Sequence, residues 1–136
     1  MEISINSGIV SFAIFWLMFL VHIRTDFNQG IIASMKQRNW WEDHYPNDLY
    51  KNDYKIVLLI HSIEWSVSIM IIPATRYIIL GGKSIIILSI ILVLNVIVHL
   101  VVDDLKANKL AINLNMDQTI HFVQILVTWL VLVIIL

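Results

Sequence analysis

The sequence predicts an all-α membrane protein whose single integral membrane domain, residues 1–136, is a four-transmembrane-helix up-down-up-down bundle. Hydrophobic residues make up 59% of the chain and charged residues 14%, whereas a soluble domain carries roughly 25% charged residues. The apolar residues are gathered in four runs, each close to the roughly 18–20 residues that a helix needs to cross a bilayer. Short connections make consecutive helices antiparallel. The expected spans are residues 6–24, 55–74, 84–104 and 117–136.

The first span does not read as a signal peptide, because it lacks a basic leading region and a small-residue cleavage site. An interfacial stretch, Phe27–Arg38, is expected after it. The next segment, residues 39–48, mixes turn formers with tryptophan and tyrosine, which favour the level of the lipid headgroups. We interpret this segment as a loop on the membrane surface, so that an interfacial loop or helix joins the first two spans.

The later spans have their own start and stop signals. Pro73 is expected to kink or end the second helix. Gly81 and Gly82 predict a short turn before the third helix. Asn115 or Asp117 is expected to cap the fourth helix.

The distribution of basic residues predicts the orientation. Seven lysines and arginines follow the first and third spans, and two lie on the opposite side: Arg24, Lys36, Arg38, Lys51, Lys55, Lys106 and Lys109, against Arg76 and Lys83. Because these residues accumulate in cytoplasmic loops, both termini are expected outside, in a multi-pass protein of the inner (cytoplasmic) membrane. The net charge of −1 argues against a nucleic-acid partner, and the absence of cysteine excludes disulfides and thiolate metal ligands.

Each of the four spans carries a histidine and a carboxylate three or four residues apart, and all the pairs fall toward the cytoplasmic end. The pairs are His22 with Asp26, His61 with Glu64, His99 with Asp103, and Asp117 with His121. These spacings put both side chains on one helix face. Ionisable groups inside a membrane are rare and face the bundle interior. We therefore expect one shared polar site.

Imidazole and carboxylate together suit a divalent metal such as zinc, manganese, iron or nickel. The proposed metal ligands are His22, Asp26, His61, His99, Asp103, Asp117 and His121. Glu64 is the candidate catalytic base, by the usual role of a free carboxylate beside a metal-bound water. The candidate substrate-binding residues are Gln29, Lys36, Lys106 and Gln118. A proton or cation pathway and a metal-free structural network of polar groups are the alternatives.

Several segments resemble a known family. The segment from His22 to Gln29 resembles the H-x-x-x-D-F-x-x-Q signature of domain of unknown function 3307, a family of small integral membrane proteins of bacteria and phages. The segments 59–61, 99–106 and 117–121 are also similar to that family, so the likeness spans about residues 18–125. The resemblance implies no activity. A looser similarity, in the use of histidine and aspartate at helix ends, is to membrane-bound metal-dependent hydrolases related to a LexA-regulated inner-membrane protein.

These observations favour a metal-dependent hydrolase of a lipid-linked or phosphorylated substrate. One alternative is a component of a proton or cation transporter, which needs polar residues along its whole length. The outer halves of the first two spans offer only small hydroxyls such as Ser11 and Ser68. The other alternative is a non-enzymatic viral factor that binds a host membrane protein or forms a homo-oligomer in the lipid bilayer.

Overall fold

A computed structural model describes residues 2–27 and 30–135, with side chains from residue 8 onward. Within these residues the chain forms helices, turns and bends and contains no strand, which confirms the all-α prediction. The elements are α1 (Glu2–Phe27), α2 (Ile31–Met35), α3 (Arg38–His44), α4 (Asp53–Ile79), α5 (Ile85–Ala107), α6 (Leu114–Trp129) and the π-helical η1 (Leu130–Ile135).

Four helical segments are long and apolar enough to cross a bilayer. They are Gly8–Phe27, Asp53–Ile79, Ile85–Ala107 and Leu114–Ile135, with 20, 27, 23 and 22 residues. Large apolar side chains such as Ile60, Val93 and Val127 are exposed on the outer faces of these helices. Such faces suit contact with lipid tails. The chain is therefore consistent with a multi-pass membrane protein.

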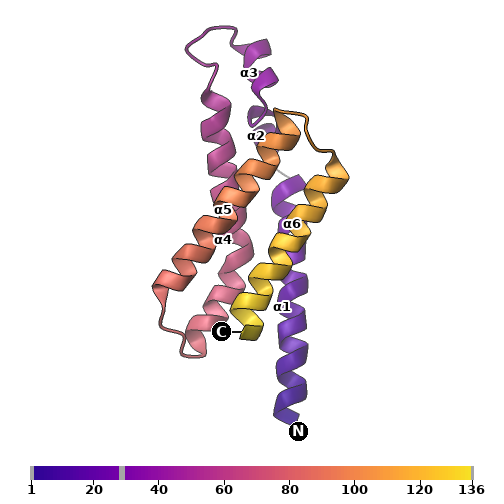
Figure 1. The fold of residues 1–136 in the computed structure, drawn as a ribbon, viewed down its shortest axis with the longest axis vertical. Coiled ribbons are helices and arrows are strands. Elements are labelled where there is room, and N and C mark those ends of the chain that lie inside the picture. The colour runs from indigo at the N-terminus through magenta and orange to yellow at the C-terminus, as the bar shows by residue number, and fades with distance from the viewer. Residues whose placement is uncertain (1, 28–29, 136) are drawn as a thin grey trace.

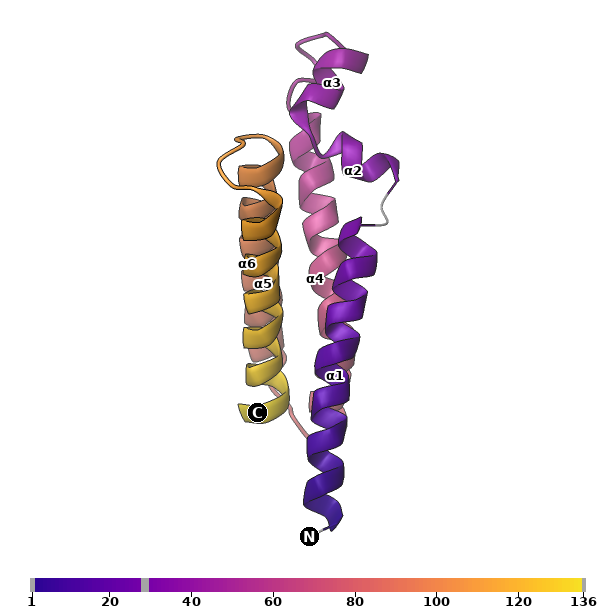
Figure 2. The ribbon, with the colours of Figure 1, turned by 90° about the vertical axis from the view of Figure 1, so that its right-hand side faces the viewer.

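The long helices pack side by side around a common interior (Figures 1 and 2). α4 contacts both α1 and α5, and α6 contacts both α5 and α1. In Figure 1 consecutive long helices run in alternating directions, and both chain ends lie toward the bottom of the view. The short helices α2 and α3 lie at the opposite end, where α2 packs against α4.

The apolar core occupies the half of the bundle nearer the chain ends. In each long helix the core residues lie between the histidine and the end of the bundle that holds the two chain ends. Ile14 in α1 and Ile125 in α6 are placed in this way relative to His22 and His121. The buried members are Ile14, Phe15, Met18, Trp65, Ile69, Met70, Tyr77, Leu88, Ile125, Leu132 and Val133. The other half of the interior holds the buried histidines and aspartates, together with the apolar Leu58 and Val102.

The connection between α1 and α4 differs from the expected surface loop. Residues 38–44 form α3, because Trp41 is buried and its Nε1–H donates to the carbonyl of Met35 at 2.7 Å. The ring of His44 stacks on Trp40, with 4.4 Å between centroids. These contacts stabilise a short helix in a segment that is rich in turn formers.

Two helix-boundary predictions are also corrected. Pro73 does not end α4, which continues to Ile79 with the proline ring buried. Neither Asn115 nor Asp117 caps α6. Asn113 does so, since its Oδ1 accepts from the N–H of Met116 at 2.9 Å. The cap therefore lies four residues before Asp117, whose carboxylate is free to point into the bundle.

The turn between α4 and α5 depends on its glycines. Gly81 has a φ of +92°, a left-handed conformation that glycine adopts without a steric penalty. Gly82 lies against the Tyr77 ring with no room for a Cβ atom. Ser84 then caps α5 by accepting from the N–H of Ile87 at 3.3 Å. This tight turn places α5 directly beside α4.

Candidate metal centre

The predicted site residues of all four long helices meet in the polar half of the bundle. His22 and Asp26 come from α1, His61 from α4, His99 and Asp103 from α5, and Asp117 and His121 from α6. All of them are buried, and His61, His99, Asp117 and His121 are 0% exposed. Because a separation of four residues is about one helical turn, each histidine lies on the same face as its aspartate. The predicted convergence of the pairs is therefore present for three of the four helices.

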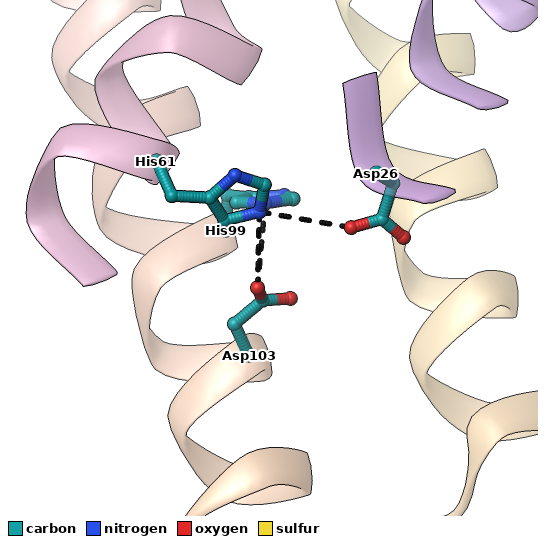
Figure 3. Close-up of side chains that lie close together, drawn as sticks. All are labelled: Asp26, His61, His99 and Asp103. Carbon is teal, nitrogen blue, oxygen red and sulfur yellow. Dashed lines mark hydrogen bonds and ion pairs between the residues drawn. The ribbon is translucent and has the colours of Figure 1, made fainter. Parts of the chain in front are cut away.

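The first group of potential ligands is Asp26, His61, His99 and Asp103 (Figure 3). One ligand atom from each residue lies within 4.8 Å of the others. The Nε2 atoms of His61 and His99 are 3.0 Å apart. His61 Nε2 lies 3.2 Å from Asp103 Oδ2 and 3.6 Å from Asp26 Oδ1, and His99 Nε2 lies 3.8 Å from Asp103 Oδ2.

These separations match those of ligands around one small ion. Zinc binds nitrogen and oxygen at about 2.0–2.2 Å in a tetrahedron, so adjacent ligand atoms are roughly 3.3–3.6 Å apart. The four separations between ligand atoms, 3.0, 3.2, 3.6 and 3.8 Å, fall on both sides of that range. The group could therefore hold a metal ion with only small movements of its side chains.

A second group shares Asp26 with the first and adds Asp117 and His121. His121 Nε2 lies 3.4 Å from Asp117 Oδ1 and 3.2 Å from Asp103 Oδ1, so this histidine links the two groups. Asp26 Oδ1 and Asp117 Oδ1 are buried without a hydrogen-bond partner among the described residues. Buried carboxylate oxygens in that state are costly unless a cation lies near them.

Two lysines supply positive charge to these carboxylates. The Nζ atom of Lys36 donates to Asp103 Oδ2 at 2.6 Å and lies 3.8 Å from Asp26 Oδ1. Lys106 Nζ donates to Asp117 Oδ2 at 2.7 Å, and its side chain is 30% exposed. The exposure of Lys106 shows that this edge of the site faces the end of the bundle.

His22 lies next to both groups but belongs to neither. Its Nδ1 accepts from Trp65 Nε1–H at 2.9 Å, which places its own proton on Nε2. That Nε2–H donates to Gln118 Oε1 at 3.1 Å. The Nε2 of Gln118 donates in turn to Asp26 Oδ2 at 2.7 Å and Asp117 Oδ2 at 2.9 Å. His22 therefore orients two carboxylates through Gln118, and both of its nitrogens are already engaged.

Ring contacts surround the remaining histidines of the site, and one of these contacts is stacked. Trp65 stacks on His99, with 4.2 Å between centroids and an interplanar angle of 18°. The ring centroid of His99 lies 4.2 Å from that of His121 and 4.9 Å from that of His61. The far Nδ1 atoms of these three histidines have no hydrogen-bond partner in the described part of the chain, unlike most metal-binding histidines. Ring contacts replace the usual second hydrogen bond.

Two of the expected site residues are not placed in the site. Glu64 is exposed on the side of α4 that lines a pocket with Arg24, Thr25 and Ser68. An offset of three residues turns it about 60° from His61, away from the buried face that carries Trp65. The expected position of Glu64 at the floor of the site is therefore wrong. Gln29 lies outside the described residues.

Below the histidines a smaller polar network joins α5 and α6. Gln124 Nε2 donates to Asn95 Oδ1 at 2.8 Å, and Asn95 Nδ2 donates to Thr128 Oγ1 at 3.0 Å. Toward the chain ends this column gives way to buried apolar side chains, including Leu88 and Leu132. The polar interior is therefore one-sided.

Sequence reasoning missed two features of the site. Trp65 lies four residues after His61, the same spacing as the His/Asp pairs, so the pattern contained a signal for it. The burial of Lys36 had no such signal, because it depends on how the short helices fold over α4.

Comparison with protein-family models, curated proteins and solved structures finds no match for this chain. The resemblance to domain of unknown function 3307 stays a prediction.

Proposed function

We propose that the protein binds a divalent transition metal, with zinc, manganese, iron and nickel as candidates, between α1, α4 and α5. The ligands are Asp26, His61, His99 and Asp103. The observation that carries this proposal is the spacing of their ligand atoms. His61 Nε2 lies 3.0–3.6 Å from one atom of each of the other three residues, and His99 Nε2 lies 3.8 Å from Asp103 Oδ2. The buried carboxylates of Asp26, Asp103 and the neighbouring Asp117 also favour a divalent cation, since buried charges are normally paired or coordinate metals.

We propose hydrolysis of a lipid-linked or phosphorylated substrate as the activity of this centre. A bound metal lowers the pKa of a coordinated water and polarises a phosphoryl oxygen. Asp117 replaces Glu64 as the candidate base, because its Oδ1 has no hydrogen-bond partner among the described residues and lies 3.4 Å from His121 Nε2. The ammonium groups of Lys36 and Lys106 border the same site and would attract a phosphate.

A proton or cation pathway is the second candidate, favoured by the Asn95–Gln124–Thr128 network. A pathway needs polar groups across the whole membrane, whereas this column ends against Leu132 and Leu88. A polar site confined to one half of the bundle fits an enzyme better than a conduit.

We further propose that this polar end faces the cytoplasm of a cell whose inner membrane holds the protein, with both termini outside. Seven lysines and arginines belong to this side and two to the other. Lys36 and Lys106 are occupied by the site. The five that remain still exceed the two on the opposite side, in agreement with the positive-inside rule.

Metal analysis of the protein purified without chelator tests the metal proposal. His99→Ala removes a ligand, and His44→Ala is the matched control, because His44 is exposed and stacks on Trp40 in α3. We expect about one metal per chain in the wild type and in His44→Ala, and loss of metal in His99→Ala with helical content retained. Wild-type protein that stays folded and metal-free after incubation with each candidate ion would remove the metalloenzyme proposal. Release of phosphate from phosphorylated lipids by the metal-loaded protein then tests the activity.

A further inference from the structure

Lys36 occupies an unusual position for a lysine in a short surface connection. It follows α2 directly, yet it is only 8% exposed. Its Nζ lies 2.6 Å from Asp103 Oδ2, 3.2 Å from His61 Nε2 and 3.8 Å from Asp26 Oδ1. Three of the four residues proposed to bind metal therefore contact this ammonium group.

The ammonium and a metal require the same electron pairs. An ammonium group has three donors and no acceptor, so a hydrogen bond across its 3.2 Å contact with His61 would use the Nε2 lone pair of that histidine. A metal likewise takes the lone pair of a neutral imidazole and those of carboxylates. Lys36 and a metal ion therefore compete for the Nε2 lone pair of His61 and for the space beside Asp103 Oδ2.

The charge balance of the site leads to the same conclusion. Asp26, Asp103 and Asp117 contribute three negative charges, and Lys36 and Lys106 contribute two positive charges. Counted over these five groups alone, the net charge is minus one. A divalent ion added beside Lys36 would leave a net positive charge, whereas an ion that replaces the Lys36 ammonium leaves none. Exchange is therefore favoured over addition, because uncompensated charge is costly in a buried site.

The main chain around Lys36 is held independently of its ammonium group. Asn108 Nδ2 donates to the carbonyl of Lys36 at 3.3 Å, and Asn108 Oδ1 accepts from the N–H of Arg38 at 2.7 Å. Trp41 also donates to the carbonyl of Met35. The flexible lysine side chain can therefore leave the site while the segment stays in place.

We propose that Lys36 is a built-in cation that holds the metal-binding atoms of His61 and Asp103 until a divalent metal displaces it. This inference rests on the proposed metal site and adds a mechanism that sets its affinity. Lys36 keeps the metal-free site neutralised, and its displacement lowers the apparent affinity for metal.

Lys36→Met tests this exchange, because methionine keeps an unbranched apolar stem and removes the charge. The control is Lys109→Met, since Lys109 is exposed and its one ion pair among the described residues is with Asp104. Zinc affinity is measured by competition with a fluorescent chelator in detergent. Without metal, Lys36→Met should melt at a lower temperature than the wild type, and zinc should restore it. Its dissociation constant for zinc should fall about tenfold or more, because the cost of displacing the competitor is gone.

Amine acylation of the wild type, read by mass spectrometry, keeps the inference testable if Lys36→Met fails to fold. Lys36 should be protected without zinc and reactive with zinc, whereas Lys109 should react in both states. If zinc binds the wild type but Lys36 stays protected, or if Lys36→Met binds zinc no more tightly than Lys109→Met, the exchange is refuted and the metal site stands. If the wild type binds no zinc, manganese, iron or nickel, the proposed function fails together with this inference.

Discussion

Asp103 and Asp104 are adjacent carboxylates in very different surroundings, so substituting each by asparagine isolates the effect of burial. Asp103 is 1% exposed and accepts from Lys36 at 2.6 Å, with His61 and His121 each at 3.2 Å. Asparagine keeps the shape but replaces one acceptor oxygen with a donor and leaves Lys36 without its nearest countercharge. Removing one partner of a buried ion pair costs about 3–5 kcal/mol. Asp104 pairs with the exposed Lys109 at 3.0 Å, and such surface pairs contribute roughly 0–1 kcal/mol.

The comparison is made on chelator-treated protein, in which Lys36 remains paired with Asp103. Reversible unfolding in mixed micelles, followed by far-ultraviolet circular dichroism, gives the free energy of unfolding. Asp103→Asn should lower it by about 3–5 kcal/mol and Asp104→Asn by about 1 kcal/mol or less. Equal losses in the two variants would refute the claim that a buried ion pair at Asp103 stabilises the bundle.

Three further predictions follow from individual side chains. Single cysteines at Asn47 and Lys83, both exposed, should label from opposite sides of intact cells with Lys83 outside, and the reverse pattern would overturn the orientation. Trp65→Phe keeps an aromatic ring against His99 but removes the donor to His22, so the free energy of unfolding should fall by about 1–3 kcal/mol; an unchanged value in mixed micelles would contradict this. Glu64→Gln should leave metal content unchanged by elemental analysis, since Glu64 is exposed outside both ligand groups; a loss of metal would return it to the site.

The helices and the meeting of the histidines were predictable because both follow from local spacing. An apolar run of about 20 residues has few alternatives to a membrane-spanning helix. A histidine and an aspartate four residues apart on such a helix share one face, and that face turns inward because charge is costly in lipid. His99 with Asp103 and Asp117 with His121 follow this rule and are fully buried.

The predictions failed for two reasons. Sequence spacing alone did not show which of two neighbouring residues on a helix faces inward, and it did not show how a short connection folds over the site. Glu64 and Trp65 are both close to the face of His61, and only the packing of α4 against its neighbours selects the tryptophan. The position of Lys36 could not be predicted from its spacing. Its burial depends on the fold of α2 and α3 and on the hydrogen bonds of Asn108 to the main chain of this segment. The distinction between an engaged histidine, His22, and one available to a metal likewise depends on tertiary partners.

The two halves of the bundle hold their helices together by different means, and this affects how variants of the site must be interpreted. In a bilayer, apolar packing gains little from exclusion of water, because lipid tails solvate the same surfaces. The half that contains Ile69 and Leu132 therefore depends on close packing. The other half joins α1, α4, α5 and α6 through charged and hydrogen-bonded contacts, such as His61 with Asp103 and Gln118 with Asp26. A residue such as Asp103 then supports both the proposed chemistry and helix association, so lost activity in its variants indicates a catalytic role only where helical content and unfolding free energy are measured alongside.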